Sequence, residues 1–241
     1  MAPGLARRLL AEYLGSAFLA ALVIGSGIAA QRLSRDPGLQ LLENAAATAA
    51  GLFAIILMFG AVSGGHFNPV VSLVDAVFGG LSRRDALAYI PAQIAGCITG
   101  AVAANAMFSL AAISVSDNHR ASAAHLFAEV IATLGLLLVI FALARTGRIS
   151  AAPAAVGAYI GAAYWFTSST SFANPAITIG RMFSDTFAGI APASVPGFVV
   201  AQLVGGAVAV GVIRTLYPDV TPGVAADVVV PHVSEAADGR R

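Results

Sequence analysis

Two Asn-Pro pairs, Asn68-Pro69 and Asn174-Pro175, are the residues of this sequence best suited to recognise a small molecule. Asn is one of the strongest N-cap residues, and Pro is favoured at the first position of a helix. Each pair therefore predicts a helix that begins at the Asn, whose side-chain oxygen accepts hydrogen bonds from the helix amides. Its NH2 group then remains free to donate to a passing solute, which is recognition by hydrogen bonding rather than catalysis.

Two glutamates, Glu12 and Glu129, lie within apolar stretches, where an ionised side chain is costly unless it is partnered. A proton relay would need further carboxylates or histidines along a path, and the apolar stretches contain almost none. We therefore expect both carboxylates to accept backbone N–H bonds from the loops that precede the Asn-Pro pairs. His66 is open to two interpretations, a titrating gate or, as we favour, a neutral histidine that is structural or lines a pore.

These polar residues occur twice in the same order along the chain. Glu12 lies in AEYLGSAFLAAL and Glu129 in AEVIATLGLLLV, while GGHFNPVVSL is matched by SFANPAITIG. Gln93 lies in PAQIAGCITGA and Gln202 in VAQLVGGAVA. The three matches fall at offsets of 117, 106 and 109 residues, and such an ordered series indicates an internal duplication.

The composition decides which class of protein must position these residues. Of the 241 residues 58% are hydrophobic and only 10% are charged, whereas soluble domains average about 25% charged residues. The formal net charge of +1 and the absence of a basic cluster argue against binding of nucleic acid. No nucleophile–base set or metal-ligand cluster is recognisable, so we expect neither an enzyme, nor a metal site, nor a cofactor. The composition predicts a polytopic membrane protein.

Six apolar stretches are long enough to cross a bilayer, which takes about 20 helical residues. We place them at Leu9–Ala30, Leu42–Val62, Ala86–Leu110, Ala124–Ala144, Ala151–Phe166 and Ser194–Leu216. Two further apolar pieces, Asn68–Phe78 and Asn174–Phe183, are too short to cross. We expect a single channel domain over residues 1–216, with repeats at about 5–110 and 122–216, and a cytoplasmic tail over residues 217–241.

The duplication requires the two repeats to have opposite orientations, because each contains an odd number of spans. The two short pieces then become re-entrant half-helices that enter from opposite faces, with their N-termini meeting near the middle of the bilayer. Irregular backbone at that depth must be buried in protein or line a wet cavity. We expect the loops before the half-helices to line a pore with the backbone of Gly64, Gly65, His66, Phe172 and Ala173. The positive ends of the two helices would repel cations and let neutral molecules pass.

Arginine distribution predicts the orientation of the chain. One side carries Arg7, Arg8, Arg83, Arg84, Arg145, Arg148, Arg214, Arg240 and Arg241. The opposite side carries only Arg32, Arg35 and Arg120. By the positive-inside rule, both termini are expected in the cytoplasm, with the protein in the inner (plasma) membrane as a multi-pass protein.

The six spans, the inverted repeat and the sequences HFNPVVSL and FANPAITIGR together resemble the aquaporin and aquaglyceroporin (major intrinsic protein) family over about residues 5–216. The resemblance implies an all-α membrane protein with six transmembrane helices, two half-helices and an hourglass pore in each subunit of a homotetramer. It implies that the pore motifs are Asn68-Pro69-Val70 and Asn174-Pro175-Ala176. Val70 stands where the family's first motif usually has Ala, and we expect this change to affect packing only.

The family's outer constriction, its selectivity filter, is usually lined by four positions, one of them an Arg three residues after the second motif Asn. Counting from the motifs, the resemblance assigns these positions to Thr48, Ala162, Ser171 and Ile177, which carry neither charge nor aromatic ring. Arg181 lies one helical turn past Ile177, but we expect it to lie deeper and not to replace the missing Arg. A filter of this kind should be wide and weakly polar, so that larger uncharged solutes pass.

The stretch AYWFTSSTSFANPAITIGRMFSDTFAGIAP is similar to the aquaporin-type channels of bacterial arsenic-resistance operons, which also lack the filter Arg. This resemblance implies passive permeation by arsenite, as neutral As(OH)3, and by methylated arsenicals, in addition to glycerol-like polyols and water. One alternative is a general water and glycerol facilitator without a role in metalloid transport. Another is a secondary transporter, which can also be built from inverted repeats with broken helices but needs coupling-ion ligands at the midplane.

Overall fold

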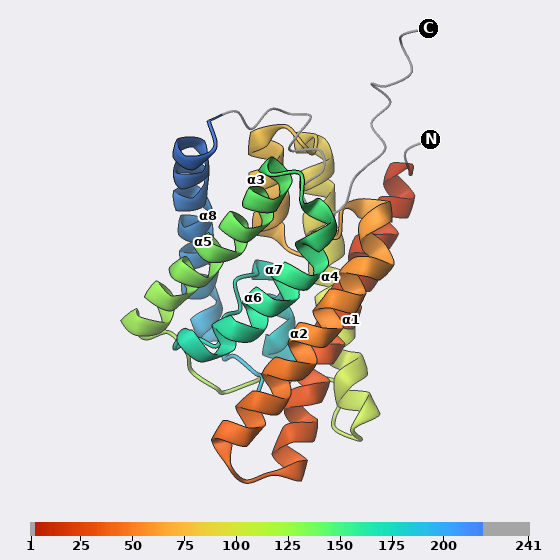
Figure 1. Ribbon diagram of the computed structural model, residues 1–241. Coiled ribbons are helices and arrows are strands. Elements are labelled where there is room, and N and C mark those ends of the chain that lie inside the picture. The colour runs from red at the N-terminus through yellow and green to blue at the C-terminus, as the bar shows by residue number, and fades with distance from the viewer. Residues whose placement is uncertain (1–2, 219–241) are drawn as a thin grey trace, which may run out of the picture.

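Six long helices and two short ones make up the part of the chain that the computed structural model describes, residues 3–218 (Figure 1). The long helices are α1 (Leu5–Leu33), α2 (Pro37–Ser63), α4 (Arg83–Met107), α5 (Ala123–Arg145), α6 (Ala152–Phe166) and α8 (Val195–Leu216). The short helices are α3 (Pro69–Phe78) and α7 (Pro175–Gly180). Within these residues there is no strand, and six helical segments are long and apolar enough to cross a membrane. The predicted fold class is confirmed; of the predicted tail, residues 219–241 lie outside the described part.

Local capping explains where the long helices differ from the predicted spans. α2 begins at Pro37, earlier than predicted, because the Asp36 carboxylate accepts a hydrogen bond of 2.9 Å from the amide of Leu39. α4 begins at Arg83 because the hydroxyl of Ser82 caps its first turn. It ends at Met107, before the predicted Leu110, where the chain turns through Ser109 at a positive φ of 57°.

The two half-helices begin where the sequence predicts but differ in length. α3 runs for 10 residues from Pro69 to Phe78 and is followed by Gly79 in a left-handed conformation. α7 has only 6 residues, and the chain continues from Arg181 to Phe183 as a tighter 3₁₀ turn instead of the predicted α-helix. The amide of Arg181 still donates to the carbonyl of Ile177, as in an α-helix, so the change of helix type affects the chain beyond Arg181.

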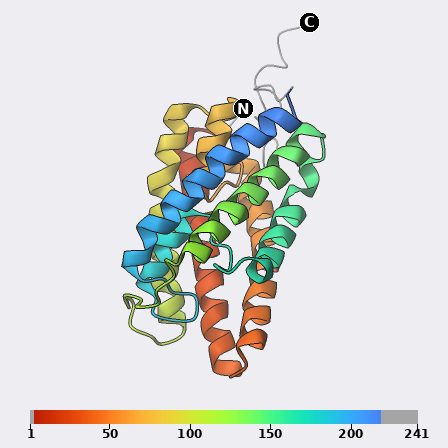
Figure 2. The same cartoon turned by 90° about the vertical axis from the view of Figure 1, so that its left-hand side faces the viewer.

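The helices are arranged as two equivalent sets. In the first, α1 packs against α2 and α4; in the second, α5 packs against α6 and α8, and α2 meets α6 between the sets. Each half-helix contacts both α4 and α8, the last helices of the two sets, and α3 and α7 also touch each other. The start of α1 and the end of α8 lie at the same end of the molecule in both views (Figures 1 and 2). Because the chain crosses an even number of times, its first and last helices begin and end on the same side.

Glycine allows the equivalent pairs α1–α4 and α5–α8 to approach closely. A Cβ atom on Gly96 or Gly100 of α4 would collide with the carbonyl oxygens of Tyr13 and Ala17 on α1. A Cβ on Gly205 of α8, the repeat mate of Gly96, would lie 2.6 Å from the carbonyl oxygen of Val130 on α5. In lipid, where helices gain little from hydrophobic expulsion, such contact between backbones supplies much of the packing energy.

Candidate functional site

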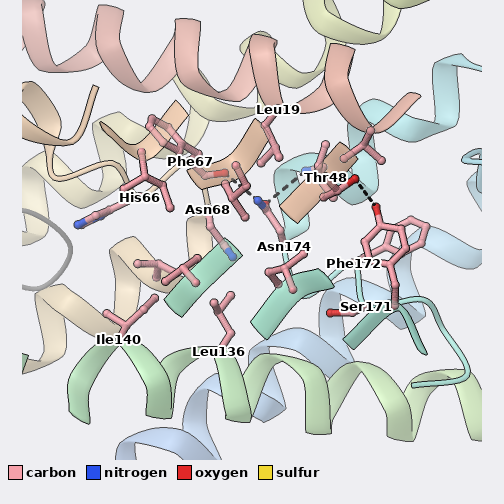
Figure 3. A pocket seen from close by; sticks show the side chains of 18 of the residues that line it. Leu19, Thr48, His66, Phe67, Asn68, Leu136, Ile140, Ser171, Phe172 and Asn174 are labelled. Carbon is pink, nitrogen blue, oxygen red and sulfur yellow. Dashed lines mark hydrogen bonds between the residues drawn. The ribbon is translucent and has the colours of Figure 1, made fainter. Parts of the chain in front are cut away.

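A cavity of about 60 Å³ lies where the two half-helices meet (Figure 3). Its apolar lining comes from several helices and consists of Leu19, Val23, Leu52, Ile56, Val71, Leu136, Ile140, Val156, Ile160 and Ile177, with the rings of Phe67 and Phe172. Its polar lining consists of Thr48, His66, Asn68, Tyr164, Ser171, Asn174 and Arg181. The volume is enough for a few water molecules. A molecule in the cavity would therefore meet an extended hydrocarbon surface and a limited set of hydrogen-bonding groups.

Asn68 and Asn174 lie at the centre of the site and cap the two half-helices. The Oδ1 of Asn68 accepts from the amide of Val70 at 3.0 Å, and the Oδ1 of Asn174 accepts from the amide of Ala176 at 2.9 Å. Each Nδ2 donates across the repeat boundary, from Asn68 to the carbonyl of Ala173 and from Asn174 to that of Phe67, both at 2.7 Å. The sequence prediction that both amide hydrogens stay free therefore needs correction. One hydrogen of each NH2 group locks the two halves together, and the other is left for a solute.

The carboxylate of Glu12 holds the loop before α3 in shape. It accepts from the amides of His66 at 3.0 Å and Phe67 at 2.7 Å, and from the side chains of Ser63 at 2.6 Å and Gln93 at 2.7 Å. Phe67 has a φ of 48°, in the left-handed region that non-glycine residues rarely adopt. The hydrogen bonds to Glu12 stabilise this conformation, and it directs the Phe67 carbonyl toward Asn174.

Glu129 does the same for the loop before α7. Its carboxylate accepts from the amides of Phe172 at 2.9 Å and Ala173 at 2.8 Å, and from Gln202 at 2.6 Å. Ala173 has a φ of 47°, almost the value of its repeat mate Phe67. Both glutamates are fully buried, and both accept the backbone bonds that the sequence predicts.

Two glutamines and two hydroxyls complete these networks, and their roles were missed by the sequence reasoning. Gln93 donates to the hydroxyl of Ser72 at 3.0 Å, and Gln202 donates to the hydroxyl of Thr178 at 2.9 Å. Ser72 and Thr178 in turn donate to the carbonyls at the start of α3 and α7. The signal was present in the sequence, because each hydroxyl lies four residues after its motif Asn.

The loop residues divide between those that line the cavity and those that lie behind it. The side chains of His66 and Phe172 line it, whereas Gly64, Gly65 and Ala173 are buried outside its lining. The prediction that the backbone of these five residues lines the pore is therefore wrong in part, and the Ala173 carbonyl is occupied by an Asn amide. The Nδ1 of His66 lies 3.0 Å from the Ser72 hydroxyl, and its Nε2 lies 3.5 Å from a carboxylate oxygen of Asp75.

Three of the four residues assigned to the filter line the cavity. Thr48 and Ser171 do so with hydroxyls and Ile177 with an apolar chain, and the Thr48 hydroxyl lies 3.2 Å from that of Tyr164. The assignment of Ala162 to the filter is wrong, because Ala162 is exposed on the outer surface of α6. It lies two residues before Tyr164, which is about 200° around the helix.

The spacing of apolar residues in α6 contained the information that the motif count lacked. Val156, Ile160 and Tyr164 recur every four residues and form the stripe of α6 that faces the cavity. Tyr164 is only 3% exposed, and it brings an aromatic hydroxyl to this end of the cavity.

Arg181 also lines the cavity, contrary to the sequence prediction. Its residue exposure is 2%, its Nε donates to the carbonyl of Ala188, and its guanidinium carbon lies 3.5 Å from the centroid of the Phe172 ring. Phe172 packs edge-on against Phe198 at a centroid distance of 5.1 Å. The cavity lining therefore includes a guanidinium and aromatic rings in addition to three of the residues assigned to the filter.

The chemistry available to the site is hydrogen bonding in a partly apolar environment. In the described residues no group of histidines, cysteines and acids could hold a metal ion.

The loop residue Arg120 lies behind Phe172, with its guanidinium carbon 5.6 Å from the ring centroid. Burial lowers the pKa of Arg120 from its ordinary value, and the carbonyls of Phe187 and Gly189 accept its hydrogen bonds at 2.9 Å each.

Both the sequence and the fold are similar to those of known proteins. Residues 2–173 match the family model described as "Major intrinsic protein". The chain is 47% identical over 218 residues to the aquaglyceroporin AqpS of Rhizobium meliloti, covering 90% of this chain and 93% of that protein. It is 30% identical over 187 residues to a probable TIP-type aquaporin of Medicago truncatula, covering 71% and 72%. The X-ray structure of the aquaglyceroporin from Plasmodium falciparum superposes with a TM-score of 0.71 over 90% of this chain and 99% of that chain, at 20% identity, which is a likeness of fold.

Proposed function

Because the chain belongs to the major intrinsic protein family and is a membrane channel for water and glycerol-like solutes, we propose that its cavity also conducts arsenite and methylated arsenicals as neutral molecules. Transport is passive, and no cofactor takes part. The proposal rests on the chemistry of the cavity wall rather than on the family alone.

The observation that carries the proposal is the division of the cavity lining into an apolar surface and a set of hydrogen-bonding groups. Leu19 approaches from one side and Leu136 and Ile140 from another, with Asn68 and Asn174 between them (Figure 3). A polyol has one edge of hydroxyls and one of hydrocarbon, so such a lining replaces its hydration on one edge and packs against the other. Neutral As(OH)3 is a small molecule with three hydroxyls, and it makes similar demands.

Thiol chemistry supports passage of trivalent arsenic, since a cysteine on the wall would trap it. Cys97 is the only cysteine in the sequence. It is fully buried, is absent from the cavity lining, and packs under Gly180, where an added Cβ would lie 2.7 Å from the Cys97 Cβ. An arsenical in the cavity would meet oxygen and nitrogen donors only.

We further propose a homotetramer in the plasma membrane with both termini in the cytoplasm. The arginine-rich loops, the start of α1 and the end of α8 lie on one side (Figure 1), in agreement with the positive-inside rule. Protease protection in right-side-out and inverted vesicles tests the orientation, and native mass spectrometry in detergent tests the tetramer.

Flux measurements in proteoliposomes test the solute proposal. Stopped-flow light scattering reports water and glycerol, and total arsenic inside filtered vesicles reports arsenite and methylated arsenicals. Val71→Phe, which fills the cavity from α3, should abolish all four fluxes, whereas Val200→Phe on the exposed face of α8 should leave them unchanged. Arsenical uptake at the rate of empty vesicles, with glycerol still passing, would disprove the arsenical proposal and leave the channel intact.

A further inference from the structure

We propose that Arg181 is the cationic, solute-contacting residue of the constriction at the α7 end of the cavity, and that it excludes cations while donating hydrogen bonds to neutral solutes. Ile177 stands at the position where the family usually has an Arg. Arg181 supplies the positive charge from one turn further along the chain. This inference rests on the proposed function, since it requires that a solute passes through the cavity.

The placement of the guanidinium is the first support. Arg181 begins the 3₁₀ turn after α7, and its side chain lies against the Phe172 ring, which itself lines the cavity. Only its Nε has an acceptor among the described residues, the carbonyl of Ala188. The two Nη groups carry four further N–H donors and find no acceptor there, so these donors remain for whatever occupies the cavity.

The charge balance around Arg181 is the second support. Within the described residues it makes no ion pair, and the nearby carboxylate of Glu129 is already engaged by Phe172, Ala173 and Gln202. The neighbouring charged side chain is Arg120, whose guanidinium also lies over the Phe172 ring. A buried guanidinium without a carboxylate is strongly destabilising unless a polar medium solvates it. The contents of the cavity provide that medium, and two arginines make the local potential positive.

The inverted repeat gives the third support. Arg181 lies seven residues after Asn174, and its repeat mate Asp75 lies seven residues after Asn68. Each contacts the residue two before its own motif Asn: Asp75 lies 3.5 Å from the His66 imidazole, and Arg181 stacks on Phe172. The same position in the two halves thus directs an ionisable side chain back toward the loop before its own half-helix, an acid in the α3 half and a base in the α7 half.

Three variants in proteoliposomes test the proposal: Arg181→Gln, Arg181→Lys and, as matched control, Arg214→Gln. Arg214 is exposed near the end of α8 and also lies over a phenylalanine ring, that of Phe78 at 5.9 Å, away from the cavity. Proton leak is read from an internal pH dye under an imposed membrane potential, and glycerol flux from light scattering. Removing a charge from a narrow, weakly hydrated passage should raise the proton leak by about tenfold or more. Arg181→Gln should show this rise with glycerol flux retained, whereas Arg181→Lys and Arg214→Gln should match the wild type.

A double variant separates a charge requirement from a structural one. Ile177→Arg combined with Arg181→Gln moves the guanidinium back by one turn and should restore exclusion of protons. Where Arg181→Gln alone does not fold, the double variant decides: a proton-tight channel supports the proposal and a leaky one overturns it. A wild-type leak in a folded Arg181→Gln channel, or equal leaks in the Lys and Gln variants, would also overturn it. Failure of the wild type to pass glycerol would instead refute the proposed function.

Discussion

The α3 half of the molecule (residues 5–107) and the α7 half (residues 123–216) share one backbone plan and differ in the side chains at the ends of the cavity. In both, a buried glutamate holds a left-handed residue, and an Asn caps the half-helix and donates across the boundary. Two residues before and seven residues after the Asn, the α3 half carries His66 and Asp75, while the α7 half carries Phe172 and Arg181. The network that builds the channel is thus duplicated, whereas the residues that set its charge have diverged.

The largest loss of stability is expected when either buried glutamate is replaced, and the loss should differ between the two halves. Glu12 accepts four hydrogen bonds from described residues and Glu129 accepts three. Glu12→Gln turns an NH2 group toward buried donors, which should cost about 3 kcal/mol or more, and Glu129→Gln somewhat less. Thermal unfolding in detergent measures the difference, with Glu43→Gln as control. Equal losses would contradict the predicted difference between the halves, and no loss in either variant would show that the loops do not depend on these carboxylates.

The motif asparagines should give the next largest effect, and here the halves should behave alike. Asn68→Asp and Asn174→Asp each replace a donor by an oxygen facing the carbonyl that it bonds at 2.7 Å. Each should cost about 2 kcal/mol. A carboxylate at the meeting point of two helix N-termini would also weaken cation exclusion. Calorimetry and proton-leak assays test this, and wild-type behaviour in both would contradict a central position for the altered Asn.

The close packing of α1 on α4 and of α5 on α8 predicts a smaller difference in stability between variants of the two halves. Gly96→Ala should destabilise the α1–α4 pair more than Gly205→Ala destabilises α5–α8, since the Cβ on Gly96 meets a carbonyl more closely. Overpacking of this kind costs about 1–3 kcal/mol. Gly211→Ala, whose Cβ would have open space around it, is the matched control. The reverse order of unfolding temperatures would contradict the packing described for the two pairs.

The smallest effect on stability is expected at Ile177, where the change should alter selectivity. Ile177→Arg adds a second guanidinium beside Arg181, narrows the passage and should reduce the flux of bulky solutes while water still passes. Ile177→Leu, which keeps the apolar surface, should retain wild-type fluxes. Paired stopped-flow traces with water and a larger polyol test the contrast. Unchanged flux of the larger polyol through Ile177→Arg would exclude position 177 from the constriction.

Local chemistry made much of this architecture predictable. An Asn followed by Pro can be recognised as a helix start from two residues, and a glutamate in an apolar span demands donors wherever it folds. The bond from Asn68 to the Ala173 carbonyl was not predictable, because it depends on how two segments 105 residues apart meet.

The rotation of one helix and the direction of one long side chain account for the errors at the constriction. Counting residues from a motif placed Ala162 in the filter, but the rotation of α6 presents Tyr164 to the cavity. Arg181 was expected to lie deeper because it is one turn further along the half-helix. Side chains on a helix point toward its N-terminus, so the long side chain of Arg181 reaches back to the Phe172 ring.

A single experiment tests the central claim that this cavity conducts neutral solutes and excludes charge. Glycerol entry and internal pH are followed together in vesicles containing the wild-type protein, under an imposed membrane potential. We predict that glycerol equilibrates much faster than in empty vesicles, stops at the external concentration, and leaves the pH signal at the level of empty vesicles. Glycerol entry at the empty-vesicle rate, accumulation above the external concentration, or a proton current that scales with the amount of protein would contradict the claim.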